Sequence, residues 1–159
     1  MRKTSIVVVA LLALALASAA ATAVPKPIVF VGKYTGTATT QAADNVVTIT
    51  ASGTGLGTKI GAGKVTGAGK GDSSQQPCVP FTGTGKMTGP KGTLTFKVNP
   101  GSSGCGDEAG QLFSVSGKAT VLKGTGLLIK RKGTLKMSGT FDRSSGAFTV
   151  KFAGNLVAS

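Results

Sequence analysis

The chain has 159 residues, with 18 lysines and arginines against five aspartates and glutamates, and a net charge of +13 at neutral pH. It has no histidine, which excludes Ser–His and Cys–His nucleophile pairs and histidine-ligated metal centres. We therefore expect no metal site and no cofactor.

The first 23 residues have the three parts of a secretory signal peptide. A short positive segment precedes an apolar run at 6–16, and small residues ending in Ala21-Thr22-Ala23 follow it. The apolar run is too short to cross a membrane as a helix. We expect cleavage after Ala23, secretion to the extracellular space, and a single domain at 24–159 without a transmembrane segment.

Beyond the signal peptide, apolar residues recur with a period of two, which is typical of half-buried strands. Leu94, Phe96 and Val98, for example, alternate with threonine and lysine. Turn-forming pairs such as Asp44-Asn45 separate the runs. We expect eight strands, at 28–38, 45–54, 57–68, 80–88, 91–98, 111–122, 131–141 and 146–157.

The fold class that this pattern predicts is all-β. Short connections favour a meander, in which strands adjacent in sequence pair with each other. Eight antiparallel strands protect their edges best by closing into a barrel, and a two-sheet sandwich is the alternative. We expect side chains without a titratable proton to fill the interior. The predicted inward positions are Val47, Ile49, Leu94, Phe96, Val98, Phe113, Val115, Leu135, Met137, Phe141, Phe148, Val150, Phe152 and Leu156.

The stretch GTGLGTKIGAGKVTGAGKG, at 53–71, is rich in glycine and lysine and has the composition of a phosphate-binding loop. Such a loop needs Ser or Thr after its Gly-Lys pair and a helix behind it. Here Gly63-Lys64 is followed by Val65, and no helical pattern follows. We interpret the stretch as a hairpin whose glycines relieve crowding where a sheet bends tightly. A flexible linker is the alternative.

Two cysteines in an exported chain predict one disulfide, between Cys78 and Cys105. Both lie in turn-rich stretches. We expect the bond to tie the hairpin at 80–98 to the loop that precedes strand 111–122. The spacing lacks a C-x-x-C pair, which argues further against a metal site.

The lysines are spread over nearly every predicted strand, and the densest cluster is Lys130-Arg131-Lys132. Such a cluster could contact anionic cell-surface polymers, or it could simply keep the protein soluble. Aromatic residues are too few for stacking on bases, so we expect no sequence-specific nucleic-acid partner.

Several turn-and-strand motifs carry a resemblance to a known family. They are Gly53-Thr54-Gly55-Leu56-Gly57-Thr58 with Gly61, Gly124-Thr125-Gly126, Lys132-Gly133-Thr134, Ser138-Gly139-Thr140-Phe141-Asp142 and Ser145-Gly146-Ala147-Phe148-Thr149. Most of 28–157 resembles exported bacterial β-proteins that are similar to the allene oxide cyclase barrel and to plant dirigent proteins. The resemblance implies an eight-stranded antiparallel barrel. The plant cyclases use a buried carboxylate and polar residues that hold a water, and no motif here matches those residues.

Two functions therefore stay open, and the oligomeric state stays open with them. The first is a secreted, non-catalytic barrel that binds a small apolar ligand or attaches to a surface through its basic charge. The second is a cyclase-like isomerase that acts on a hydrophobic substrate inside the barrel. If the protein is an enzyme, its candidate polar residues are Tyr34, on a strand, and the adjacent pair Asp107 and Glu108. The inward positions without a titratable proton favour the first function.

Overall fold

The computed structural model describes residues 26–159, and the expected signal peptide with its cleavage site after Ala23 lies outside them. In the described part, no helix is long and apolar enough to cross a membrane. The elements are β1 (Ile28–Ala43), β2 (Val46–Gly57), β3 (Gly61–Asp72), β4 (Cys78–Gly89), β5 (Gly92–Gly106), β6 (Leu112–Gly124), the 3-10 turn η1 (Gly126–Leu128), β7 (Arg131–Lys132), β8 (Thr134–Asp142) and β9 (Ala147–Ala158).

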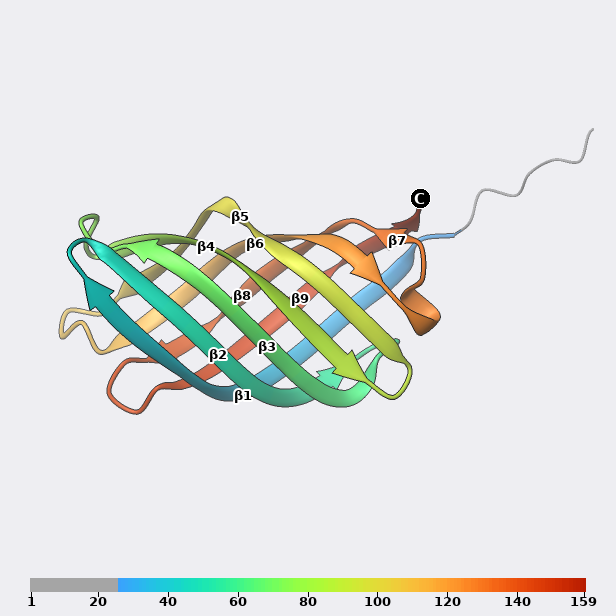
Figure 1. Cartoon of the computed structure of the whole chain (residues 1–159), viewed down its shortest axis with the longest axis horizontal. Coiled ribbons are helices and arrows are strands. Elements are labelled where there is room, and N and C mark those ends of the chain that lie inside the picture. The colour runs from blue at the N-terminus through green and yellow to red at the C-terminus, as the bar shows by residue number, and fades with distance from the viewer. Residues whose placement is uncertain (1–25) are drawn as a thin grey trace, which may run out of the picture.

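Eight long antiparallel strands form a closed ring (Figure 1). Each pairs with the next long strand in the chain, and β1 pairs with β9 from Ile28↔Leu156 to Thr37↔Ala147. The short strand β7 adds to the end of β9. The hydrogen-bond ladders of the ring are not regular throughout, because register shifts interrupt the pairing of β5 with both of its neighbours, β4 and β6. The expected all-β, eight-stranded meander barrel is thus confirmed, and the sandwich is not formed.

Strand β5 runs past residue 98, where the sequence predicted that the strand ends. Residues 99–101, Asn-Pro-Gly, lie inside β5, and its register against β6 shifts between Val98 and Ser103. They form a bulge, where proline is tolerated because the ladder needs no N–H there. The buried Ser102 hydroxyl donates to the Asn99 carbonyl at 2.9 Å. A turn-forming sequence has therefore been absorbed into a bent strand.

The two ends of the barrel are built from different connections (Figure 1). The turns β1–β2, β3–β4, β5–β6 and β8–β9 gather at one end, which we call the mouth end. The other end, which we call the closed end, contains the β2–β3 and β4–β5 turns and the β6–β8 connection. The start of β1 and the end of β9 lie there as well. Alternate connections of a meander necessarily lie at the same end.

The interior of the closed end is filled. Ile60, from the β2–β3 turn, and Leu128, from η1, are both fully buried and cover this end of the barrel. Burying each such side chain contributes about 1.5–3 kcal/mol. They pack with fully buried side chains from the strands, namely Phe30, Tyr34, Met87, Leu94, Leu135 and Leu156.

The glycine-rich stretch forms most of the β2–β3 hairpin, in which Gly55 faces Gly63 and Gly53 faces Val65. The hairpin interpretation is confirmed, and the linker alternative is wrong. A Cβ added at Gly55 would collide with the backbone of Lys33, and one at Gly63 with the backbone of Thr88. These glycines are needed because neighbouring backbones approach closely on the inner face of the bent sheet.

Alanine substitutions at two inward glycines of β3 test this close approach. In Gly63→Ala, the new methyl group meets the backbone of β4, and the free energy of unfolding should fall by about 2 kcal/mol or more. In the matched variant Gly67→Ala, the nearest atom is the Thr84 carbonyl oxygen at 3.4 Å. Its stability should stay unchanged or rise by up to about 1 kcal/mol. Urea denaturation measures both, and equal losses would contradict the explanation.

Candidate functional site

The mouth half of the barrel contains a cavity of about 440 Å³ that is open to solvent. This volume lies within the range typical of small-molecule sites. Its lining comes from inward residues of all eight ring strands, and most of it is apolar. The inward-facing aliphatic and sulfur-containing residues of the lining are Ala38, Ala42, Val47, Ile49, Ala51, Val65, Val79, Val98, Val115, Met137 and Val150.

The cavity exists because a wall rich in glycine faces a wall rich in phenylalanine. Gly67, Gly69 and Gly83, on β3 and β4, line one side without contributing a side chain. Six of the seven phenylalanines also line the cavity, and most come from β5, β6, β8 and β9. They are Phe81, Phe96, Phe113, Phe141, Phe148 and Phe152.

The predicted inward positions are confirmed, but the expectation that they fill the interior is wrong for the mouth half. Leu94, Leu135 and Leu156 are buried in the closed half, and all the other predicted positions line the cavity. Phe96 of β5 and Phe152 of β9 lie on strands that are not neighbours in the ring, and their ring centroids are 5.1 Å apart, so this pair packs across the lumen. The cavity is the volume in the mouth half that the inward side chains leave unfilled.

The polar part of the lining includes Arg143 of the β8–β9 turn and Gln76 of the β3–β4 loop. Arg143 is the one ionisable side chain among the described residues that line the cavity. Its backbone N–H donates to the Gln111 carbonyl at 2.8 Å and so joins the β8–β9 turn to the β5–β6 loop. A ligand here would meet an apolar interior and a polar, cationic group near the entrance.

Three of the mouth-end carboxylates hold their own turns. Asp142 accepts hydrogen bonds from the Ser144 hydroxyl at 2.6 Å and the Ser144 N–H at 2.8 Å, and these and the bonds from Ser145 lower its pKa to about 2. Hydrogen bonds from Ser74 and Gln75 lower the pKa of Asp72 in the same way. Asp107 accepts from two backbone N–H groups, at 2.8 and 3.2 Å. These are turn-stabilising roles.

The polar residues expected for an enzyme are not brought together. Tyr34 is fully buried in the closed half, where it pairs with Gly55 and Val150, and it does not line the cavity. Asp107 and Glu108 are exposed in the β5–β6 loop at the mouth end. The end of β1 at the mouth is nine residues beyond Tyr34, which is about 30 Å along a strand. Among residues 26–159 no three potential metal ligands cluster.

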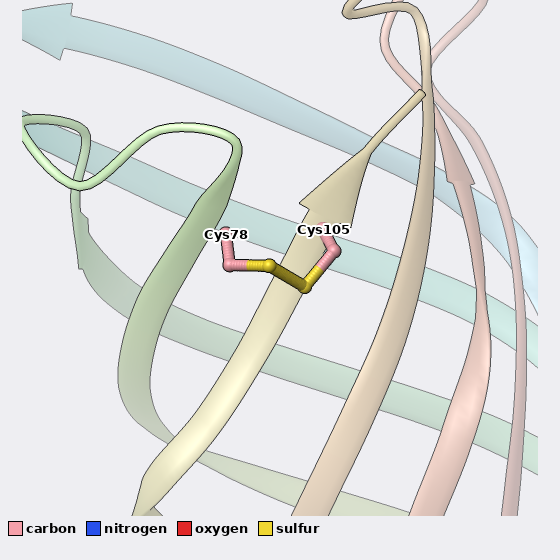
Figure 2. Close-up of a disulfide and its surroundings, with 2 residues drawn as sticks. All are labelled: Cys78 and Cys105. Carbon is pink, nitrogen blue, oxygen red and sulfur yellow. A yellow bond between two sulfur atoms is a disulfide. The ribbon is translucent and has the colours of Figure 1, made fainter. Parts of the chain in front are cut away.

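The disulfide joins Cys78 to Cys105, as expected, but not the segments that we expected (Figure 2). Cys105 lies within β5 rather than in a loop, and the two cysteines are direct partners on β4 and β5 with Cα atoms 3.9 Å apart. The bond therefore links neighbouring strands at the mouth end. The glycines and serines around Cys105 belong to a bent strand, although they are typical of a turn.

The basic cluster lies at the closed end, away from the cavity. Arg131 and Lys132 form β7, and Lys130 precedes them. The Arg131 side chain donates from Nη1 to the Lys26 carbonyl at 3.1 Å. The cluster and the cavity are therefore separate features of the molecule.

No family model, curated protein or solved structure matches this chain.

Removing the disulfide should weaken the fold without abolishing it. The two cysteines are 27 residues apart in the sequence. For the Cys78→Ser/Cys105→Ser variant we expect the free energy of unfolding to fall by about 3.5 kcal/mol, because the unfolded chain regains the conformational entropy that closing a loop of this length removes. Denaturant unfolding of the oxidised protein and of the variant measures it. A loss below about 1 kcal/mol would contradict this account.

The buried Tyr34 hydroxyl has no hydrogen-bond partner among the described residues, and burial raises its pKa above the ordinary 10.0. Tyr34→Phe removes this unpaired group, so its stability at neutral pH should equal or exceed that of the native protein. As pH rises through the raised pKa, the native protein should lose stability relative to Tyr34→Phe, because the unfolded tyrosine gives up its proton first.

Tyr34 is the one tyrosine of the chain, so ultraviolet titration of the folded protein reports on it alone. Thermal melts of both proteins across alkaline pH supply the stability difference. A Tyr34→Phe variant that is less stable by about 2 kcal/mol at neutral pH would show that the hydroxyl has a partner.

Proposed function

We propose that this protein is a secreted, non-catalytic β-barrel that binds a small apolar ligand in the cavity at its mouth end. The observation that carries the proposal is the open cavity of about 440 Å³, lined by six phenylalanines and by aliphatic side chains. Transfer of an apolar molecule from water into such a lining is favourable, and large apolar pockets with few polar groups are the usual form of small-molecule sites.

The geometry favours a flat or elongated ligand with one polar end. Tilted phenylalanine pairs, such as Phe113 and Phe141 with centroids 6.3 Å apart, offer ring surfaces for stacking. The glycine wall allows a ligand to approach the backbone closely. Arg143 and Gln76 can bind the polar end of the ligand near the entrance.

Secretion is part of this proposal. A disulfide between adjacent strands suits an oxidising compartment such as the extracellular space. The three-part pattern of the first 23 residues supports the same location.

The alternative proposal is that the barrel is related to the allene oxide cyclase barrel and isomerises a hydrophobic substrate in the cavity. The cavity itself favours it, since such a reaction needs an apolar enclosure for the substrate. Proton transfer would have to involve a hydroxyl group of the lining or a bound water, and Arg143, which stays protonated, could only stabilise negative charge. An isomer has the same mass as its substrate, so chromatography and NMR of the small molecule recovered after incubation separate the two proposals. A carrier returns its ligand unchanged, whereas an isomerase returns a compound of different structure.

Blocking the cavity should abolish binding. Ala51 faces the cavity from β2, and Ala51→Phe should fill part of it at little cost to stability, because space is available. The neighbouring Ser52 is exposed on the outer face, so Ser52→Phe adds the same side chain outside the barrel. We expect the neutral fluorescent probe N-phenyl-1-naphthylamine to bind the native protein and Ser52→Phe with saturation, and Ala51→Phe at least about tenfold more weakly, or about 1.4 kcal/mol.

Melting curves establish that both variants are folded. Equal binding by the native protein and by folded Ala51→Phe would contradict the cavity as the binding site. Failure of the native protein to bind any apolar probe or to retain a co-purified ligand would contradict the proposed function itself.

A further inference from the structure

The acidic side chains of this barrel gather at one end, and the charged side chains of the other end are cations. All five side-chain carboxylates, Asp44, Asp72, Asp107, Glu108 and Asp142, lie in or next to the turns of the mouth end. The connections of the closed end and the strand residues beside them carry cations, namely Lys59, Lys91, Lys123, Lys130, Arg131 and Lys132. The molecule therefore presents a strongly basic face at the end opposite its cavity.

Hydrogen bonds between connections bring these cations together. The backbone N–H of Lys91 donates to the Ile60 carbonyl at 3.0 Å, which joins the β4–β5 turn to the β2–β3 turn. The N–H of Leu127 donates to the Lys91 carbonyl at 3.2 Å, which joins η1 to the same group. The basic face is thus a connected surface on packed connections and does not depend on one mobile loop.

Large aliphatic side chains are exposed in the midst of this charge. Leu127 and Ile129 flank the buried Leu128 and are 56% and 64% exposed, and Leu122 on β6 is 49% exposed. A soluble polyanion would need only the cations, and exposed aliphatics are costly in water unless they have a partner. Aliphatic side chains within a basic surface are the pattern of proteins that bind at a membrane interface.

A hollow of about 240 Å³ lies among these exposed aliphatic and basic residues. Most of its surface is apolar, and the residues that line it are Leu122, Lys123, Gly124, Ile129, Lys130, Arg131, Lys132 and Ser159. Lysine and arginine side chains bind phosphate oxygens, and the aliphatic groups match the start of an acyl chain. The hollow is therefore an apolar depression among basic residues, which suits the start of an acyl chain beside an anionic headgroup.

We propose that the closed end is a docking surface for bilayers that contain anionic lipid. Leu127 and Ile129 enter the headgroup region, and the cations around the hollow bind lipid phosphates. In this orientation the cavity mouth faces the aqueous phase. A second copy of the chain does not suit this surface as a like-to-like partner, because both copies would present the same positive charge.

Co-sedimentation with vesicles tests the proposal on the exported protein. We expect binding to vesicles of phosphatidylglycerol and phosphatidylcholine in equal parts, and no binding to phosphatidylcholine alone. The variant Leu127→Ser/Ile129→Ser keeps every charge, so it should bind anionic vesicles at least tenfold more weakly and bind soluble polyphosphate as well as the native protein. The variant Lys123→Glu/Lys132→Glu should lose both kinds of binding.

The matched control is Lys97→Glu/Lys118→Glu, which makes the same charge change at exposed positions on the wall of the barrel. It should keep vesicle binding within about threefold of the native value, and melting curves should show all variants folded. Undiminished vesicle binding by Leu127→Ser/Ile129→Ser, or an equal loss in the Lys97→Glu/Lys118→Glu control, would overturn the proposal. Salt-sensitive self-association without vesicle binding would overturn it in favour of mouth-to-closed-end contacts between copies.

Discussion

The close approach of neighbouring backbones on the inner face of β2, β3 and β4 is the constraint on which the rest of this structure depends. A ring of eight strands must bend sharply to close through the β1–β9 ladder. At Gly63, Gly69 and Gly83 an added Cβ would collide with the backbone of the adjacent strand, and Gly69 and Gly83 also line the cavity. Glycine permits the bend, and it also leaves one side of the barrel interior without side chains. Closure and cavity therefore share one physical cause.

The side chains of the connections between strands decide which end of the barrel interior is filled. Ile60 and Leu128 come from connections at the closed end and are fully buried there, where they compensate for the missing side chains. The mouth-end turns are polar and are held by aspartates such as Asp107 and Asp142, whose carboxylates bond their own turns. No apolar group from these turns covers the lumen, so the apolar faces of β5, β6, β8 and β9 stay open to a ligand.

The sequence predicts the strands and their inward positions well, because the period-two alternation of apolar residues is a local property. It does not reveal the cavity, since an unfilled volume depends on side-chain sizes summed around the whole ring. Val65 and Gly67 occupy equivalent inward positions of β3, and the space that they line depends on the side chains that the other strands of the ring place inward. The strand position of Cys105 was missed because a bulged strand and a turn share glycine, serine and proline.

The separation of charge could have been found from the sequence. In a meander, every second connection lies at the same end. The side-chain carboxylates occur in or directly before the first, third, fifth and seventh connections of the ring, whereas Lys59, Lys91 and Lys130 occur in the second, fourth and sixth. The exposure of Leu127 and Ile129 was beyond sequence reasoning, because the buried Leu128 lies between them in an irregular connection.

The most direct measurement of the central claim is methyl NMR of the protein under xenon pressure, because xenon binds in apolar cavities. The account predicts that xenon shifts the methyl resonances of Val47, Val98 and Val115, which line the mouth half. The resonances of Leu135 and Leu156, which pack in the filled closed half, should stay unchanged. Equal shifts in both halves, or no shift at any of these methyl groups, would contradict a barrel with one filled half and one open apolar half.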